Sequence, residues 1–162
     1  MPPTSTMRAV RLYAHGPAED LAVETVPRPE PQPGEVLVRV QAAGVNPVDW
    51  KIRSGSMQAY MPVPLPWTPG IDLAGVVEAV GAGVTAFQPG QAVYGRGTGT
   101  YAEYALAPAV SLAPKPRNVT FDQASAIPVG ALTAWLGLFD AGGLEAGQRL
   151  LVRGAAGGVG NY

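Results

Sequence analysis

The sequence predicts a mainly β chain, a closed or partly open β-barrel, followed by the incomplete first helices, one strand and a Gly-rich turn of an α/β unit. Three observations support this fold class. From Arg8 to Leu106 the apolar residues form short runs separated by Gly and Pro, as is typical of strands joined by turns. After Pro116 the apolar spacing becomes helical. Near the end of the chain, an apolar run leads into a segment rich in glycine.

The strongest strand prediction covers residues 35–42. Apolar residues at the even positions alternate there with mostly polar residues at the odd positions, which places one apolar face on a core, and only Leu37 departs from the pattern. Weaker strand candidates are rich in Val, Ile or Tyr and are bounded by turn residues: 8–13, 21–26, 71–80, 91–94 and 101–106. Together they favour a β-barrel.

Two proline-rich segments connect these strands. In residues 27–34 and 57–69 each proline fixes φ and disfavours a helical conformation of the preceding residue, so both segments are expected to be extended. The second segment also contains Tyr60 and Trp67. We expect these aromatic side chains to seal the loop onto the barrel.

The last third of the chain changes character. Thr120 can cap a helical turn that starts at Phe121, and residues 131–139 carry Ala, Leu and aromatic residues at helical spacing, with Trp135 expected in the core. Gly142 and Gly143 should end that helix. Residues 148–152 then offer a continuous apolar run, which predicts a parallel strand buried on both faces.

Composition excludes several classes of function. Charged residues make up 14% of the chain, the formal net charge is -1, and the Lys and Arg residues form no run, so no nucleic-acid partner is expected. The lack of cysteine excludes disulfides and zinc sites built on Cys. The uncharged stretch 123–139 is broken and too short to span a membrane, and the first residues do not resemble a secretory signal. We therefore expect a cytoplasmic protein with no membrane partner.

The Gly-rich segment Gly154-Ala-Ala-Gly-Gly-Val-Gly160 directly follows the predicted strand. A strand followed by such a turn is how a dinucleotide-binding unit begins, because small residues let the backbone approach the pyrophosphate at the start of the next helix. The same residues also fit an ordinary turn. The chain ends at Tyr162, before that helix.

Five segments, taken in order along the chain, resemble the medium-chain dehydrogenase/reductase superfamily, and more narrowly its zinc-independent quinone oxidoreductase branch. They are AAGVNPVDWKIRSG (42–55), PGIDLAGVVEAVG (69–81), GTYAEY (99–104), LTAW (132–135) and GAAGGVG (154–160). The resemblance implies a GroES-like β-barrel catalytic domain over residues 7–121. It implies that residues 122–162 are the truncated start of an NAD(P)-binding Rossmann domain.

The resemblance also implies a reaction without zinc. Zinc-dependent relatives place a Cys where this sequence has Asn46 and a His where it has Ile71. We expect His15, in its Tyr-Ala-His-Gly-Pro setting, to be an exposed turn residue and not a metal ligand. Hydrogen bonds must then polarise the carbonyl group of the substrate.

Asn46 and Lys51 are the candidate catalytic residues. The resemblance implies that the Asn46 amide donates and accepts hydrogen bonds beside a nicotinamide or a substrate carbonyl, although Asn before Pro47 also suits a turn. Quinone reductases of the family often carry Tyr at the position of Lys51, a departure that leaves quinone specificity open. The Lys51 ammonium can donate a proton, bind a phosphate or stay solvated. Asp49 and Arg53 are expected to form an i,i+4 ion pair on a short helix.

Asn46, Thr133 and the Gly-rich turn are the candidate cofactor-binding residues. The resemblance brings Thr133 close to the cofactor, whereas a helical Thr can also bond the backbone carbonyl four residues back. The turn contributes Ala155, Ala156, Gly157, Gly158, Val159 and Gly160. The implied cofactor is NADP or NAD, and no metal is expected.

The implied reaction is hydride transfer from NAD(P)H to a small-molecule electron acceptor, either a quinone or an α,β-unsaturated carbonyl compound. One strand and one turn lack the walls that bury adenosine, so we expect little or no dehydrogenase activity from this chain alone. We also expect the residues after about Gly143 to be mobile or aggregation-prone, because a lone parallel strand exposes its unpaired edges.

Two alternatives fit the same residues. The first is a stand-alone GroES-like module that binds a protein or small molecule without redox chemistry, as a defined oligomer such as a homodimer. The density of Gly and Pro and the low charge are compatible with it. The second is part of an enoyl reductase of the fatty-acid or polyketide type, which shares the superfamily.

Overall fold

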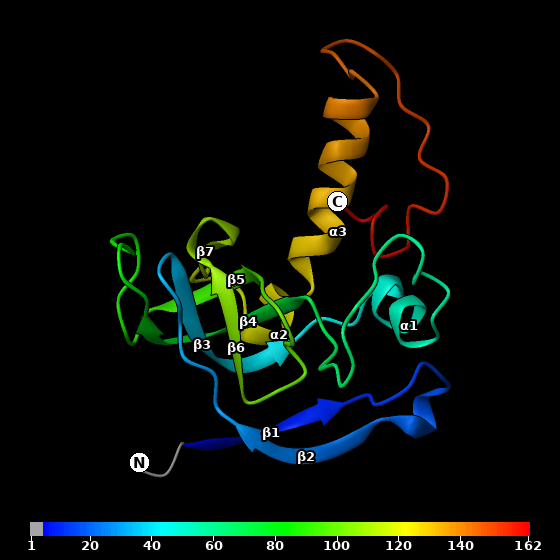
Figure 1. Ribbon diagram of the computed structural model, residues 1–162. Coiled ribbons are helices and arrows are strands. Elements are labelled where there is room, and N and C mark those ends of the chain that lie inside the picture. The colour runs from blue at the N-terminus through cyan, green and yellow to red at the C-terminus, as the bar shows by residue number, and fades with distance from the viewer. Residues whose placement is uncertain (1–4) are drawn as a thin grey trace.

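The computed structural model describes residues 5–162, and its architecture is mainly β (Figure 1). Five strands form one antiparallel sheet in the order β6-β3-β4-β5-β7, and β1 pairs with β2 in a second, two-stranded sheet. The strands are β1 (Thr6–Arg11), β2 (Ala22–Pro27), β3 (Glu35–Ala43), β4 (Asp72–Val80), β5 (Ala92–Arg96), β6 (Tyr104–Pro108) and β7 (Leu112–Pro114).

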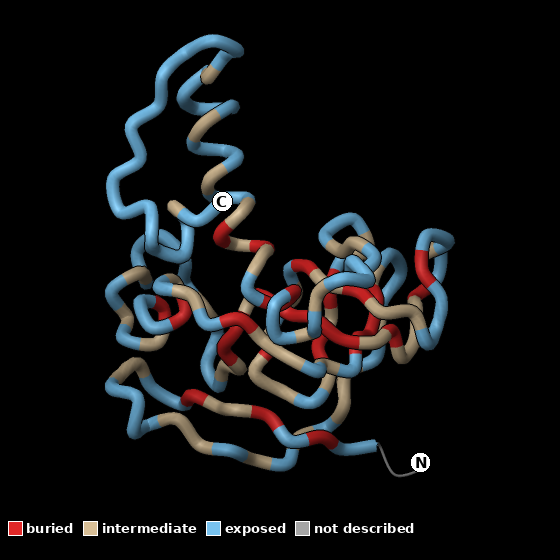
Figure 2. Tube along the Cα trace, turned by 180° about the vertical axis from the view of Figure 1, so that it is seen from behind, coloured by how far each residue is buried: buried red, intermediate tan, exposed pale blue. Residues whose placement is uncertain are grey.

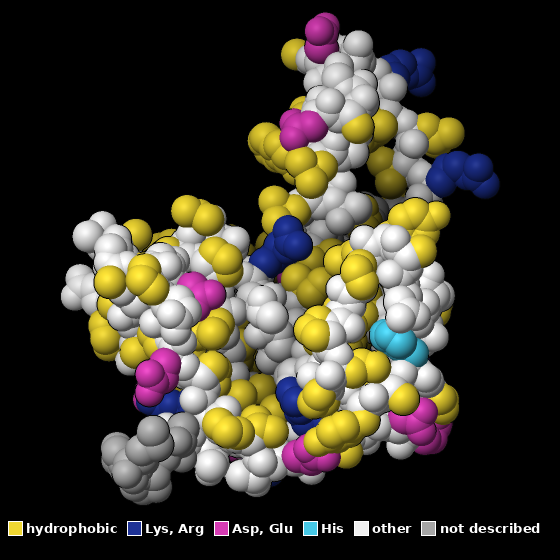
Figure 3. Space-filling model, in the orientation of Figure 1, with side chains coloured by type: hydrophobic (Ala, Val, Ile, Leu, Met, Phe, Trp, Pro, Cys, Tyr) yellow, Lys and Arg dark blue, Asp and Glu magenta, His cyan; other side chains and the backbone are white. Residues whose placement is uncertain are grey.

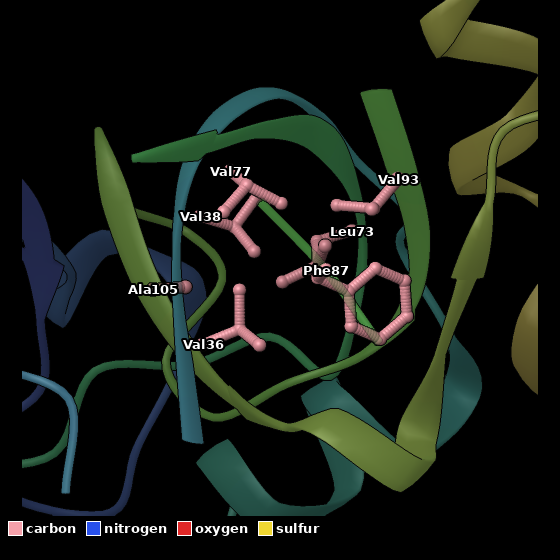
Figure 4. Close-up of a cluster of buried hydrophobic side chains, with 7 residues drawn as sticks. All are labelled: Val36, Val38, Leu73, Val77, Phe87, Val93 and Ala105. Carbon is pink, nitrogen blue, oxygen red and sulfur yellow. The ribbon is translucent and has the colours of Figure 1, made fainter. Parts of the chain in front are cut away.

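The core lies on one face of the five-stranded sheet. Its buried side chains come from β3, β4, β5, β6 and one loop, and they point toward one another in Figure 4: Val36, Val38, Leu73, Val77, Phe87, Val93 and Ala105. Leu37, which broke the predicted alternation, is only 1% exposed although it is outside this cluster. Since successive side chains of a strand point to opposite faces, β3 is buried on both faces at this point.

The two sheets are joined by backbone hydrogen bonds. The Val10 N–H donates to the Tyr101 carbonyl oxygen at 2.9 Å, and the Leu12 N–H donates to that of Trp67 at 2.8 Å. The backbone of Trp67 thus binds its proline-rich segment to the residue that follows β1, and the sequence predicts this contact between loop and barrel. Tyr60 is 82% exposed, so the expectation that it also seals the loop is wrong.

The six strands predicted between residues 8 and 106 all exist, with shifted ends. The largest shift affects the strand predicted at 101–106, which begins as β6 at Tyr104, because Tyr101 and Ala102 bond to β1 instead. The short strand β7 had no sequence prediction. It pairs with β5 after a single 3-10 turn, η2 (Ala109–Ser111), and another such turn, η1 (Ala18–Asp20), precedes β2. The mainly β fold class is therefore confirmed.

Four helical segments complete the described chain: α1 (Pro47–Arg53), α2 (Phe121–Ser125), α3 (Ile127–Trp135) and the π-helix η3 (Leu136–Ala141). Thr120 caps α2 as predicted, since its hydroxyl oxygen accepts from the Gln123 N–H at 3.2 Å. The helix predicted at 131–139 begins earlier and continues through η3. Gly142 then caps it, and Gly143 has φ +58°.

The predicted strand at 148–152 is wrong. These residues form no strand, and Leu151 is 85% exposed, because no neighbouring strand in residues 5–162 offers hydrogen bonds to them. Trp135, expected in the core, is 60% exposed, and its ring lies beside that of Phe139, with centroids 4.6 Å apart. The projecting helix and the returning chain are mostly exposed in Figure 2.

Candidate functional site

Three elements meet at one end of the five-stranded sheet: the start of α1, the start of β4 and the start of α3 (Figure 1). The chain reaches α1 from β3 through Gly44, whose N–H donates to the Asp72 carbonyl oxygen at 3.2 Å. A Cβ at Gly44 would lie 2.5 Å from the Ser125 carbonyl oxygen, so a side chain there would push α2 away from the sheet. The absence of a side chain lets the three elements approach closely.

Asn46 is held at this junction by a buried carboxylate. Its Nδ2 donates to Asp72 Oδ2 at 2.9 Å, and the same oxygen accepts the Val129 N–H at 3.1 Å. Asp72 is fully buried and is the first residue of β4. One carboxylate therefore fixes the Asn46 amide and also ties α1 to α3.

Asp49 has a different role from the predicted one. Its Oδ2 accepts from the Asn46 backbone N–H at 2.8 Å and from the Tyr101 hydroxyl at 3.0 Å. Arg53 instead donates to the Gly16 carbonyl oxygen at 3.0 Å, and no ion pair joins it to Asp49 in the part of the chain that the structure describes. The expected i,i+4 pair is wrong because Asp49 is buried against Tyr101, away from the exposed side of α1.

The two buried carboxyl groups have unusual electrostatics. Burial raises the pKa of Asp72 above its ordinary value, and the Asp49 charge adds to that rise, while the Arg96 charge acts in the opposite direction. Burial likewise raises the pKa of Asp49. Burial and the Asp49 carboxylate raise the pKa of Tyr101, so its hydroxyl stays a hydrogen-bond donor at neutral pH.

An apolar groove of about 280 Å³, which we name the α1–α3 groove, lies beside this cluster. Its walls include the chain neighbours of the cluster residues, Ile71 next to Asp72 and Val129 itself. Thr133 also faces the groove, and its hydroxyl donates to the Val129 carbonyl oxygen at 2.6 Å, the helical bond that the sequence left as an alternative. The lining residues are Val48, Met61, Ile71, Arg96, Val129, Leu132, Thr133 and Leu136.

Lys51 is not brought to this groove. It is an exposed residue of α1 whose Nζ lies 5.7 Å from the centre of the Trp50 ring. Its backbone carbonyl oxygen accepts from the hydroxyls of Ser54 and Ser56. Of the three possibilities that the sequence left open for Lys51, the solvated surface position describes it in this structure.

The Gly-rich segment folds back against α3. Val159 and Gly160 line a smaller groove of about 200 Å³ together with Thr133, whereas residues 155–158 are exposed. A Cβ at Gly160 would lie 2.5 Å from the Gly154 carbonyl oxygen, so the turn is too tight there for a side chain. Such a turn fits the close backbone approach that a pyrophosphate needs, although no helix follows it among residues 5–162.

Sequence reasoning missed Asp72, Tyr101 and Arg96. A signal existed for Asp72, since a carboxylate opens a strand whose next five residues are all uncharged, and a buried charge needs hydrogen-bond partners. Tyr101 and Arg96 carried no such signal. Their positions depend on how β1 and β4 pair with distant segments.

His15 is half-buried and not exposed as expected, with Nδ1 3.1 Å from the Ile52 carbonyl oxygen. Within the described residues, no three His, Cys, Asp or Glu side chains cluster closely enough to hold a metal ion. None of the helices formed by these residues is long and apolar enough to cross a membrane.

Several known proteins similar to this chain are described as oxidoreductases or reductases. The quinone oxidoreductase of Mus musculus is 44% identical over 158 residues, which are 95% of this chain and 47% of that protein. The 2-methylene-furan-3-one reductase of Solanum lycopersicum is 38% identical, covering 97% of this chain and 43% of that protein. A solved structure of a mycobacterial protein complexed with NADPH is 37% identical with a TM-score of 0.85, covering 95% of this chain and 46% of that chain. The chain thus spans about half the length of the relatives it matches.

The family comparison agrees with the folded core. The family described as the alcohol dehydrogenase GroES-like domain matches residues 32–117, more than half of the chain, from the approach to β3 to the end of β7. This range contains Asn46, Asp49, Asp72 and Tyr101. The chain belongs to the alcohol dehydrogenase GroES-like domain family, in the quinone oxidoreductase-like branch of the medium-chain dehydrogenase/reductase superfamily.

Proposed function

We propose that this chain is the catalytic-domain part of an NAD(P)H-dependent oxidoreductase that transfers hydride, without zinc, to a quinone or an α,β-unsaturated carbonyl compound. The observation that carries the proposal is the Asn46 amide, fixed by the buried Asp72 carboxylate beside the apolar α1–α3 groove. Similarity to a quinone oxidoreductase, to a 2-methylene-furan-3-one reductase and to an NADPH-bound mycobacterial protein supports it.

Asn46 supplies the electrostatic part of the reaction. One of its two Nδ2 hydrogens bonds Asp72, so the amide is held in one orientation. The second hydrogen donates to the acceptor oxygen on which negative charge develops, which favours the transition state over the ground state. Val48, Ile71 and Leu136 give the groove apolar walls, against which a bound acceptor would displace water.

The cofactor side of the site is formed by Thr133 and the Gly-rich turn. Bound NADPH or NADH supplies the hydride. Thr133, Val159 and Gly160, which line one groove, would hold the cofactor, and the small residues of the turn would allow its pyrophosphate to approach the backbone. Because Lys51 stands away from the α1–α3 groove, the reduced acceptor takes up its proton from solvent.

Substitution of Asn46 tests the proposal. The assay is NADPH oxidation with a quinone acceptor, by the gene product that contains this chain together with whatever sequence follows the Tyr162 codon in the gene. We expect Asn46→Ala to lower kcat/KM about a hundredfold, because an oriented donor to the developing oxyanion is lost. The matched control is Asn118→Ala, at an exposed loop position, which should leave kcat/KM unchanged. Equal activity of Asn46→Ala and the unsubstituted protein would refute the role of Asn46.

The same assay addresses the alternative of a binding module. We expect residues 1–162 by themselves to oxidise little NADPH, because their Gly-rich turn is exposed and offers no walls for adenosine. If the gene continues after Tyr162 and the longer product is also inactive with quinones and enones, the binding-module alternative takes first place.

A further inference from the structure

Arg96 lines the α1–α3 groove and is a charged side chain that the proposed mechanism does not use. It is the last residue of β5 and lies directly opposite Asp72 in the antiparallel β4–β5 pair. Directly opposed residues of two strands present their side chains on the same face of the sheet. Arg96 therefore stands on the face that carries the Asp72 carboxylate and the start of α3.

The Arg96 guanidinium has no carboxylate partner among residues 5–162. The ion pairs in this part of the chain join Arg8 to Glu103, and both Arg28 and Arg39 to Glu78. Asp72 forms no ion pair with Arg96 in this part of the chain: its Oδ2 accepts from Asn46 and Val129, and its Oδ1 has no hydrogen-bond partner. The five N–H donors of the Arg96 guanidinium are thus left for solvent or a ligand.

Arg96 borders two apolar grooves. The α1–α3 groove is one, and the other, of about 400 Å³, lies between β5 and α3, where it is lined by residues such as Val110, Leu112 and Ile127. Of the described residues that line either groove, Arg96 is the only charged one. In Figure 3 a basic side chain stands at the base of the projecting helix, among hydrophobic side chains.

This arrangement suits a ligand that is apolar at one end and anionic at the other. The walls bury a hydrocarbon skeleton, and a guanidinium binds a carboxylate through two parallel hydrogen bonds, which a neutral group cannot reproduce. Thr133 and Ile71, which face the proposed reaction, line the same groove as Arg96. A ligand that bonds Arg96 and extends along this groove therefore places its apolar part beside the Asn46 cluster.

We propose that Arg96 is a specificity-determining residue that selects electron acceptors carrying a carboxylate, with their unsaturated carbonyl part lying in the α1–α3 groove. The inference rests on the proposed function, because it names the acceptor class of the same site. It assigns Arg96 to binding and gives it no part in hydride or proton transfer.

Binding of two matched probes to the 162-residue chain, without cofactor, tests this inference. The first probe is 3-benzoylacrylate, an aromatic enone with a carboxylate, and the second is its uncharged amide. The chain has no cysteine that could add to either enone. Titrations followed by calorimetry or by NMR shifts compare the unsubstituted chain with Arg96→Gln, Arg96→Lys and Arg117→Gln. Arg117 is an exposed cation that lines neither groove. Arg117→Gln therefore removes the same charge as Arg96→Gln but leaves both grooves unchanged.

We expect the acid to bind about tenfold more tightly than the amide, because hydrogen bonds between charged groups are worth more than neutral ones. Arg96→Gln should abolish this preference, Arg96→Lys should retain part of it, and Arg117→Gln should retain all of it. The inference is overturned if the acid and the amide bind equally, if neither binds, or if the preference survives in Arg96→Gln. A parallel titration with NADP tests whether Arg96 binds the cofactor instead of the acceptor. If Arg96→Gln loses NADP binding but keeps the preference for the acid, the inference is also overturned.

The two proposals fail separately. The binding experiment contains no cofactor and measures no turnover, so loss of the acid preference leaves the hydride-transfer proposal standing. Lack of NADPH oxidation by the longer gene product would refute the proposed function, whether or not the acid binds at Arg96.

Discussion

At the scale of single residues, two buried carboxylates define the site. Asp72 connects Asn46 of α1 to Val129 of α3, and Asp49 connects the Asn46 backbone to Tyr101. Each carboxylate also has one buried oxygen, Oδ1, without a hydrogen-bond partner among the described residues. Burial therefore favours the protonated form of both groups.

The raised pKa of Asp72 predicts how the free energy of unfolding depends on pH. Because this carboxyl has a higher pKa in the folded chain than its ordinary value of 3.8, the folded state binds the proton more tightly than the unfolded state. Its contribution to the free energy of unfolding is fully present below that ordinary value and is lost as pH rises through the folded-state pKa. We expect the difference in free energy of unfolding between the unsubstituted chain and Asp72→Asn, from urea titrations, to shrink as pH rises from about 4.

Glu103 provides the control with the opposite sign. Hydrogen bonds from the Arg8 backbone and side chain lower the pKa of Glu103. The difference between the unsubstituted chain and Glu103→Gln should therefore grow as pH rises toward the ordinary Glu pKa of 4.5, and stay constant above it. An Asp72→Asn difference that grows with pH in the same way would contradict the raised pKa.

Sequence and structure agree only partly on the site residues. Asn46 is at the centre of the site as the sequence analysis proposes, and the Asn before Pro47 does begin a helix. The partner that orients it could not be identified, because Asp72 lies 26 residues away and Val129 lies 57 residues beyond Asp72. Lys51 shares a short helix with Asn46, yet helical geometry turns it to solvent.

At the scale of elements, α3 and η3 present an apolar face that nothing in the described chain covers. Leu132, Trp135, Leu136 and Phe139 are each between 42% and 60% exposed. The helical spacing of these residues correctly predicts a helix with an apolar face, but spacing alone does not say what packs on that face. Contiguous exposed apolar residues of this kind favour association.

We expect this face to cause self-association of the 162-residue chain. The double substitution Trp135→Gln and Phe139→Gln should lower the weight-average mass from light scattering, and should change the free energy of unfolding by less than about 0.5 kcal/mol, because both side chains are already exposed. The control is Val23→Gln, an exposed apolar residue on β2, which should leave the mass unchanged. An unchanged mass in the double variant would show that another surface drives association.

At the scale of the whole molecule, the stable body is the pair of sheets with α1 and α2. Buried residues concentrate there in Figure 2, and the last two buried positions along the chain are Pro128 and Gly130. Residues 144–162 are almost entirely exposed. Their described contacts with the rest include the Tyr162 hydroxyl, which donates to the Ala126 carbonyl oxygen at 3.2 Å.

Truncation tests this division. A chain that ends at Gly143 should lose less than about 1 kcal/mol of unfolding free energy, because the removed segment is almost entirely exposed and adds only an exposed hydrogen bond and the contact of Tyr162 with Gly130. A chain that ends at Asn118 should lose much more, since it lacks the buried residues Ala124 and Ser125 and the Val129 bond to Asp72. Equal losses in the two truncations, measured by urea unfolding, would mean that residues 144–162 belong to the folded body.

The sequence by itself determined the local structure: the six longer strands, the cap at Thr120 and the helix end at Gly142 and Gly143. These features follow from period-2 and helical patterns and from the positions of proline and glycine. Such signals act over a few residues, so they predict local structure without knowledge of tertiary contacts. Only the tertiary structure decided that Leu37 is buried, that Arg96 stands opposite Asp72, and that residues 148–152 form no strand. Each of these depends on segments distant in the sequence, because a strand needs a neighbour to bond and a charge needs a partner that only folding brings close.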